Sequence, residues 1–215
     1  MSIDPVASRL AASGVAYAPE IAGAAQRHGL DPDLLAAVAA QETGGPDANA
    51  GHNIVGDGGH GRGVFQIDDR WHAFASTPAA MDPAKNADYA AGMLAGLLKQ
   101  YGGNVHEALS AYNSGSPTAS GTKTRWSDGT NLGYADSVMR HYGQLTGEAP
   151  AGGGEEPYST AIAEAPTSIA SVGRLDAAAQ RFPLQPPSLP ALSREHAFHR
   201  QTTDYLSLFS DDTTD

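Results

Sequence analysis

Apolar residues recur at helical spacing through the first 149 residues, and capping residues mark where the helices should begin and end. Asp31 followed by Pro32 is typical of a helix start, and the run Gly44-Gly45-Pro46 is typical of a helix end. A further turn or two is expected at the periphery, over residues 5 to 13. The pattern predicts five main helices, over Pro19 to His28, Pro32 to Thr43, Pro83 to Tyr101, Val105 to Tyr112 and Tyr134 to Leu145.

A glycine-rich segment separates the second of these helices from the third. Five of the residues 56 to 63 are glycines, and apolar and polar residues alternate just after them. Alternation with period two predicts a short strand. Its two faces would carry Val64, Gln66 and Asp68 on one side, and Phe65 and Ile67 on the other. The fold class is therefore expected to be mainly α with a small β element.

The composition changes after residue 149. The last 66 residues hold seven of the 14 prolines and a run of three glycines at 152 to 154. Because proline fixes φ and removes a backbone donor, this stretch is typical of a linker and an extended arm. Residues 191 to 209 regain apolar density, which either a short docking helix or a weakly ordered end would explain. We therefore divide the chain into an N-terminal segment (1–16), a folded domain (17–148) and a C-terminal arm (149–215).

Composition and charge exclude several classes of protein. The longest apolar run, Leu34 to Ala40, is too short to span a bilayer. Thirteen basic against 24 acidic residues give a net charge of -11, which repels polyphosphate, so nucleic acid is not an expected partner. Without cysteine there are no disulfides and no thiolate metal sites. The first ten residues contain an acid, a proline and no apolar stretch, so no Sec-type signal peptide is expected.

Glu42 is the first candidate for chemistry. It follows Leu35, Val38 and Ala39 by seven, four and three residues, which places its carboxyl group on the apolar face of the second helix. Apolar surroundings and the negative end of the helix dipole both favour the neutral carboxyl group. A carboxylic acid that is neutral at pH 7 can protonate a leaving glycosidic oxygen. The alternative is that Glu42 faces solvent where the helix ends.

Asp57 and Asp68 are the next candidates. Asp57 lies in the glycine loop 15 residues after Glu42, and Asp68 ends the expected strand 11 residues later. Glycines let the backbone turn with positive φ and let a bulky ligand approach the main chain. The three acids are expected to share one cleft, and a plain surface loop is the alternative.

Other kinds of site find little support. The glycines at 56, 58 and 61 match G-x-G-x-x-G, but a dinucleotide site needs a strand before the motif and a helix after it, whereas here a strand follows. The chain has no H-E-x-x-H, and His52, Asp57 and His60 lie in a loop too flexible for a rigid metal cage. It has no G-x-S-x-G either. Neither a metal nor another cofactor is expected.

Several short segments resemble the goose-type lysozyme and lytic transglycosylase family, and they occur in the same order as in that family, over about residues 17 to 145. Gln41-Glu42-Thr43 resembles the helix-borne catalytic glutamate of the family, followed by a small hydroxyl residue. The stretch from Gly56 to Arg70, with His72 just beyond, is similar to goose-type enzymes in particular. Three further segments resemble the family's G-L-M-Q, A-Y-N-A-G and late D-x-G-T motifs: Gly63 to Gln66, Ala111 to Gly115 with Ser114 in place of alanine, and Asp128 to Ala135.

The resemblance implies a lysozyme-like α-domain that cuts the β-1,4 bond after N-acetylmuramic acid in peptidoglycan, with Glu42 as general acid. Two fates of the cleaved centre stay open. Water guided by Asp57 and Asp68 would give hydrolysis, and attack by the substrate's own 6-hydroxyl would give a 1,6-anhydro end. The presence of both aspartates favours hydrolysis. The resemblance also implies that sugar subsites are lined by Gln66, His72, Tyr112, Asn113 and Tyr134, although the tyrosines would equally suit the core.

The expected setting is a bacteriophage virion, in which residues 150–215 tether the enzyme to a tail or injection machine so that it opens the cell wall locally. An endolysin released through a holin is one alternative. A structural or glycan-binding part with an idle active site is the other, and the presence of all three acids argues against it.

Overall fold

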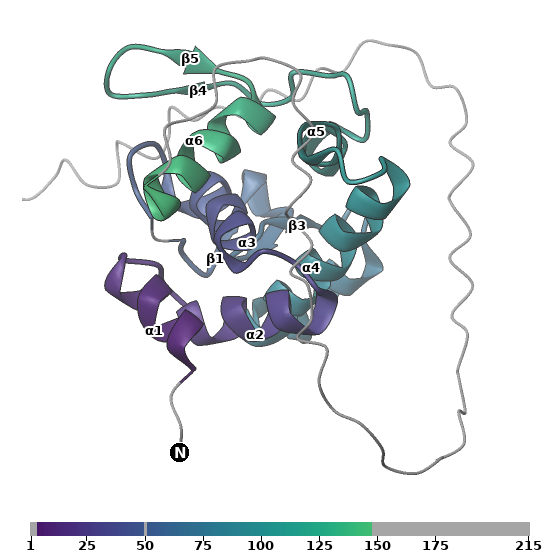
Figure 1. Cartoon of the computed structure of the whole chain (residues 1–215). Coiled ribbons are helices and arrows are strands. Elements are labelled where there is room, and N and C mark those ends of the chain that lie inside the picture. The colour runs from purple at the N-terminus through teal and green to yellow at the C-terminus, as the bar shows by residue number, and fades with distance from the viewer. Residues whose placement is uncertain (1–3, 50, 148–215) are drawn as a thin grey trace, which may run out of the picture.

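The computed structural model describes residues 4–49 and 51–147, so the C-terminal arm lies outside the described residues (Figure 1). Both alternatives for residues 191–209, a docking helix and a weakly ordered end, therefore stay predictions. The helices expected within residues 5–145 are confirmed, with ends that differ by one or two residues. A π-helical turn, η1 (Ala40–Gly44), continues the helix that begins at Pro32 and covers its predicted end at Thr43. The helices of the described part are α1 (Pro5–Ala12), α2 (Ala18–His28), α3 (Pro32–Ala39), α4 (Pro83–Gln100), α5 (Val105–Ser114) and α6 (Tyr134–Thr146).

Local capping chemistry sets the ends of these helices. Asp4, Asp31 and Asp82 each accept a hydrogen bond from the backbone N–H two residues on, and a proline follows each of them. Gly29 and Gly115 end α2 and α5 in the left-handed conformation, which a residue with a Cβ adopts at a cost. These signals are local, which explains why the sequence predicts the helices well.

The β element differs from the prediction. It is an antiparallel sheet in the order β1-β2-β3, formed by β1 (Ile54–Gly56), β2 (Gly61–Gly63) and β3 (Ile67–Asp68). A continuous strand over residues 64–68 is therefore wrong, because residues 64–66 form the turn between β2 and β3. Val64, Phe65, Gln66 and Ile67 are all buried, since this turn lies between the sheet and the helices. A second hairpin, β4 (Thr124–Arg125) with β5 (Asn131–Leu132), escaped prediction because its strands are too short to show a period.

Helix α3 lies at the centre of the core, and α2 and α6 pack against it (Figure 1). Every residue from Leu34 to Ala40 is buried, and four of these seven are alanines, whose small side chains let neighbouring helices approach closely. Helix α1 contributes to this core rather than lying at its periphery. Its Leu10 is fully buried, and Arg9 binds Asp33 of α3 through two hydrogen bonds of 2.8 and 2.7 Å.

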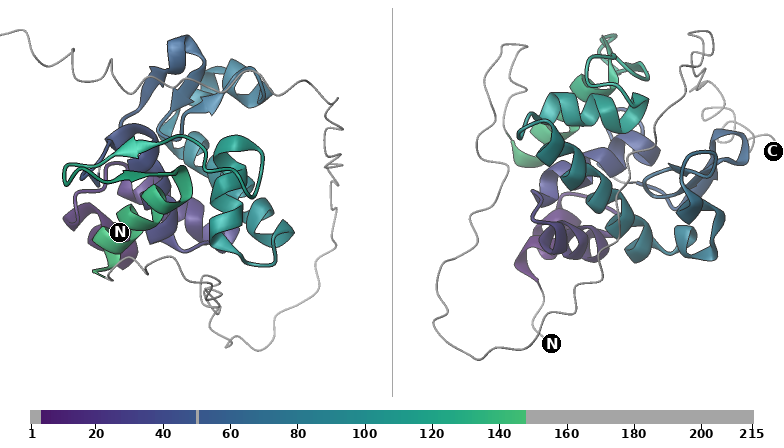
Figure 2. Two further views of the ribbon diagram at one scale, coloured as in Figure 1. Left: turned by 90° about the horizontal axis from the view of Figure 1, so that it is seen from above. Right: turned by 90° about the vertical axis from the view of Figure 1, so that its right-hand side faces the viewer.

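The sheet and the 3₁₀ turns η3 (Ala73–Ser76) and η4 (Pro78–Met81) form a lobe beside the helices, drawn in blue in Figure 2. The fully buried Asn86 of α4 anchors this lobe. Its side chain accepts from the N–H of Phe65 at 2.8 Å and donates to the carbonyls of Arg62 and Ala80, each at 3.0 Å. Gly63 passes so close that a Cβ there would lie 2.5 Å from Asn86. One amide thus fixes the sheet to the helical body.

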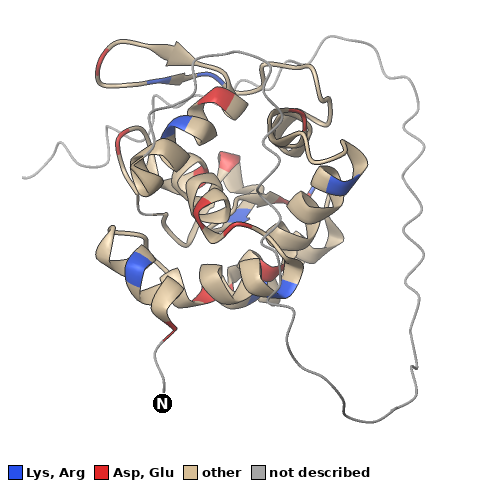
Figure 3. Ribbon diagram, viewed as in Figure 1, with Lys and Arg blue, Asp and Glu red and all other residues tan. Residues whose placement is uncertain are grey.

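Charged residues are dispersed over the described elements, with basic and acidic positions interspersed on the helices (Figure 3). Many form ion pairs with a neighbouring element or turn, such as Arg27 with Asp88 at 2.7 Å and Arg140 with Asp128 at 3.0 Å. Exposed pairs of this kind stabilise a fold only slightly. Among the described helices, none combines the length and apolarity needed to cross a membrane.

His141 of α6 makes the stability of the fold depend on pH. It is fully buried, with its ring centroid 4.7 Å from that of Trp126. Burial lowers the pKa of His141 from 6.5 to about 4. The unfolded chain therefore takes up a proton near pH 6.5, whereas the folded chain does not. The contribution of neutral His141 is complete above pH 6.5 and is lost progressively as the pH falls towards 4.

We expect His141→Phe to remove this part of the pH dependence, since phenylalanine retains a ring but cannot titrate. Urea unfolding should show the free-energy difference between wild type and variant shifting by about 3 kcal/mol in favour of the variant from pH 7 to pH 4. Carboxylate titration contributes equally to both proteins and cancels. Parallel pH profiles for the two proteins would contradict the prediction.

Candidate active site

Glu42 lies in the π-helical turn η1, where α3 ends. Its side chain is half-buried, and the hydroxyl of Tyr134 donates to Oε1 at 2.8 Å. Tyr134 is itself buried at the start of α6, 92 residues further along the chain. The carboxyl group is thus directed towards α6 and held there, rather than left in open solvent at the end of the helix. π-Helical turns within α-helices are frequent at functional sites.

Gln41, the residue before Glu42, belongs to a network of side chains that the sequence did not predict. Its Nε2 donates to Thr124 of β4 at 2.8 Å, and its Oε1 accepts from the hydroxyl of Ser137 at 2.5 Å. Ser137 also accepts from the indole N–H of the buried Trp126 at 3.1 Å. This network attaches the hairpin β4–β5 and helix α6 to the turn that carries the acid.

Thr43, the residue after Glu42, connects the same turn to the sheet lobe. Its buried hydroxyl donates to the carbonyl of Val64 at 2.9 Å and accepts from the N–H of His52 at 2.8 Å. Val64 lies in the turn before β3, and Asp68 ends that strand. The position of Glu42 is therefore fixed relative to the strand that carries Asp68.

Asp57 and Asp68 are brought together by Arg70, a residue for which the sequence suggested no role. Its guanidinium binds Asp68 through Nε at 2.9 and 3.1 Å and through Nη2 at 2.5 Å, and Nη2 also donates to Asp57. Burial raises the pKa of Asp68, but the hydrogen bonds and charge of Arg70 outweigh burial and hold that pKa below its usual value. Asp68 is therefore ionised at neutral pH.

Gln66 lies in the turn between β2 and β3 and is buried. Its amide donates to the carbonyls of Ile54 at 3.2 Å and Gly63 at 2.8 Å, so that it holds the sheet together. A Cβ at Gly56 or Gly61 would lie 2.1 or 2.3 Å from its Oε1, which explains both glycines. Gln66 itself has a φ of 47°, a conformation that non-glycine residues adopt rarely. Its contact with a sugar stays a prediction.

Tyr112 and Asn113 lie near the end of α5 and contact different parts of the fold. The ring of Tyr112 stacks on that of Tyr134, with centroids 6.4 Å apart and an interplanar angle of 18°. Asn113 accepts from the N–H of Thr122 at 2.9 Å and so shapes the loop before β4. The structure thus joins Tyr112 to Glu42 through Tyr134, whereas the described contacts of Asn113 serve the loop.

His72 follows the aspartate-bearing strand and is half-buried. One of its ring nitrogens, Nδ1, lies 3.1 Å from the hydroxyl of Tyr89, whose ring stacks on Phe74. Burial lowers the pKa of His72, and the nearby charge of Asp68 opposes that effect only in part. Between Arg70 and His72, the side chain of Trp71 is 64% exposed, an unusual position for tryptophan that the sequence analysis did not single out.

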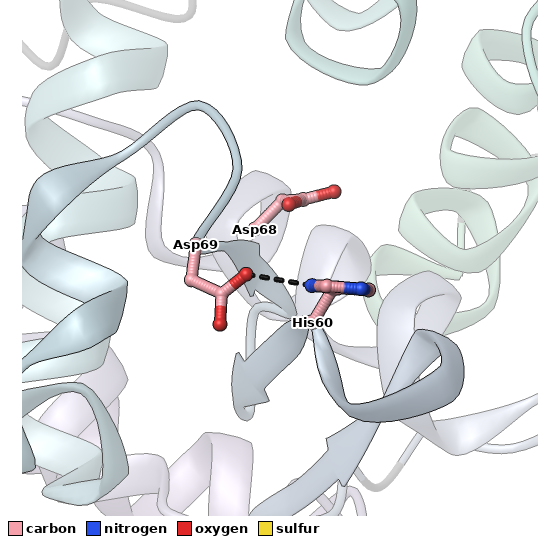
Figure 4. Close-up of side chains that lie close together, drawn as sticks. All are labelled: His60, Asp68 and Asp69. Carbon is pink, nitrogen blue, oxygen red and sulfur yellow. Dashed lines mark hydrogen bonds and ion pairs between the residues drawn. The ribbon is translucent and has the colours of Figure 1, made fainter.

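One group of side chains in the described residues has the composition of a metal site. The ligand atoms of His60, Asp68 and Asp69 lie within 4.8 Å of one another (Figure 4). However, Asp69 already binds His60 at 2.8 Å and Arg62 at 3.2 Å, and Asp68 binds Arg70. Two guanidinium groups thus compensate the two carboxylates, and a cation would have to displace both ion pairs. The charge balance favours an ion-pair network, and we assign no metal here.

A hollow in the described surface lies elsewhere, and neither Glu42 nor the two aspartates line it. The acids stay the candidate site, since acid–base chemistry needs proton donors and acceptors rather than a hollow alone. The hollow is lined by Arg27, Phe74, Ala84, Lys85, Asp88 and Tyr89.

A comparison with protein families gives an independent view of this site. The model of the transglycosylase SLT domain matches residues 20–130, which is more than half of the chain. The matched range contains Glu42, Asp57, Asp68 and Arg70 and ends just before Tyr134. No solved structure gives a significant match. The chain therefore belongs to the transglycosylase SLT domain family, whose members are peptidoglycan-cleaving enzymes with the lysozyme-like α fold that the sequence predicts.

Proposed function

We propose that this protein cuts the β-1,4 bond after N-acetylmuramic acid in peptidoglycan strands, with Glu42 as general acid. The hydrogen bond from Tyr134 to Oε1 of Glu42 is the observation that carries this assignment. Because Tyr134 binds Oε1, we assign the transferable proton of Glu42 to Oε2. Oε2 is then the atom that delivers the proton to the glycosidic oxygen.

Hydrolysis is the reaction we favour. As the bond between C1 of N-acetylmuramic acid and O4 of the next sugar breaks, Glu42 gives its proton to O4. A water molecule then forms a bond to C1 and loses a proton to the carboxylate of Asp57 or Asp68. Ionised Asp68 suits the acceptor role, and an inverting hydrolase needs about 6.5 to 9.5 Å between acid and base to admit the water. To close the cycle, Glu42 takes up a proton from solvent and the aspartate releases to solvent the proton that it accepted.

A lytic transglycosylase reaction is the second candidate, and the family match to a transglycosylase domain favours it. Here the 6-hydroxyl of the same N-acetylmuramic acid forms the bond to C1, and its proton returns to the Glu42 carboxylate. The product is a 1,6-anhydro end, which is lighter than the hydrolytic product by one water. This route needs no second carboxylate.

Glu42→Gln should lower the rate of muropeptide release from purified sacculi by at least ~10²-fold, since an amide cannot donate the required proton. Glu20→Gln, on α2, serves as the matched control and should retain wild-type activity. Circular dichroism would establish that both variants fold. Equal activity of wild type and Glu42→Gln would refute the mechanism. Inactivity of the wild type would instead favour a structural or glycan-binding part with an idle site.

We also propose that the enzyme acts from a bacteriophage virion, with residues 150–215 as its tether. The support is compositional: this arm holds seven prolines, with nine acidic against four basic residues, as befits an extended segment. Mass spectrometry of purified particles should find the chain in the tail or injection machine. Particles that lack it, with the protein accumulating late in the host cytoplasm, would point to a holin-dependent endolysin.

A further inference from the structure

We infer that Arg70 is a positioning residue that decides which nucleophile reaches the cleaved C1 centre. It holds Asp57 and Asp68 together as a pair of carboxylates that direct water, rather than the substrate's 6-hydroxyl, towards that centre. The inference rests on the proposed function, in which Glu42 starts the cleavage, and it concerns the step that follows.

The geometry of the pair is set mostly by Arg70. Asp68 Oδ1 accepts from the backbone N–H of Arg70 at 2.8 Å and from its Nε at 2.9 Å, while Oδ2 accepts from Nη2 at 2.5 Å. A guanidinium fork that meets both oxygens of a carboxylate fixes its plane as well as its position. Since the backbone of the same residue also binds Asp68, the carboxylate has little freedom to rotate.

Asp57 reaches the same guanidinium from another element, the 3₁₀ turn η2 (Asp57–Gly59). Its φ of 50° lies in the left-handed region, which aspartate tolerates better than most residues. Two carboxylates at such close range repel each other and would tend to share a proton. The positive charge of Arg70, which binds both carboxylates, offsets this repulsion.

Arg70 is more exposed than the two carboxylates that it binds. The side chains of Asp57 and Asp68 are 18% and 14% exposed, whereas that of Arg70 is 36% exposed. The two carboxylates are thus less open to solvent than the arginine that binds them. The third acid of the lobe, Asp69, is bound by Arg62 and His60 instead. Arg62 and Arg70 thus bind different carboxylates of the lobe, and Arg70 binds the two that the proposed reaction uses.

Attack by water and attack by the 6-hydroxyl depend differently on the Asp57–Asp68 pair. Attack by water transfers a proton to an aspartate, and therefore needs a carboxylate that is ionised and correctly placed. Attack by the 6-hydroxyl transfers its proton to Glu42, and the nucleophile is tethered to the reacting sugar. Loss of Arg70 should let the carboxylates separate or share a proton, which slows the water route more than the 6-hydroxyl route.

The test is the ratio of anhydro to reducing ends in digests of purified sacculi, measured by mass spectrometry. Wild type should give mainly reducing ends. Arg70→Gln should raise the ratio by ~10-fold or more. This is a modest change, since misplacing a reacting group by about 1 Å can cost ~10²-fold in rate. Arg70→Lys keeps the charge without the fork, so its ratio should fall between the two. Arg27→Gln, which removes an ion-paired arginine that contacts neither Asp57 nor Asp68, should leave the ratio unchanged.

A fall in both products at constant ratio, in both Arg70 variants, would overturn the inference while leaving the role of Glu42 intact. Wild type that yields anhydro ends alone would overturn it as well. Should Arg70→Gln fail to fold, Asp57→Asn decides: it removes one carboxylate charge and keeps the fork on Asp68, and it must raise the ratio in the same direction. Failure of the wild type to cleave sacculi at all would contradict the proposed function itself.

Discussion

One buried hydroxyl, that of Thr43, holds the acid-bearing end of the central helix against the sheet lobe. It joins the carbonyl of Val64 and the N–H of His52, two backbone groups of the lobe. The contact is so close that a Cβ at Gly51 would lie 2.9 Å from this hydroxyl and 3.0 Å from both Ala39 and Val64. Because no side chain can intervene there, the two halves of the proposed site keep a fixed separation.

Thr43 is one of three consecutive residues whose side chains bind different parts of the fold. Gln41 binds β4 and α6, Glu42 accepts from Tyr134 of α6, and Thr43 binds the lobe. The π-helical turn spaces these side chains differently from a regular α-helix, so that neighbours in sequence reach different parts of the fold. The short motif that resembles a known family thus has a physical basis, since its outer residues assemble the site around the acid.

The sequence predicts those features that depend on local chemistry. Asp31 and Pro32 begin a helix, and Gly29 ends one, whatever the rest of the chain does. The strand over residues 64–68 was wrong because alternation implies one buried face, whereas this segment is buried on both. The hydrogen bond between Tyr134 and Glu42 spans 92 residues, so only the resemblance to a family brought these two together beforehand. Nothing in the sequence singled out Arg70, because its bond to Asp57 depends on the turn at residues 57–59. Such a turn leaves no periodic pattern in the sequence.

The central claim is that Glu42 meets the glycosidic oxygen while the pair held by Arg70 lies beside the same sugar. The most direct measurement is a crystal structure of the Glu42→Gln variant with a bound peptidoglycan oligosaccharide. The account predicts the bridging oxygen at about 3 Å from the substituted side chain, with the carboxylates of Asp57 and Asp68 next to the N-acetylmuramic acid ring. A glycan bound only in the hollow lined by Tyr89, away from these three residues, would contradict it.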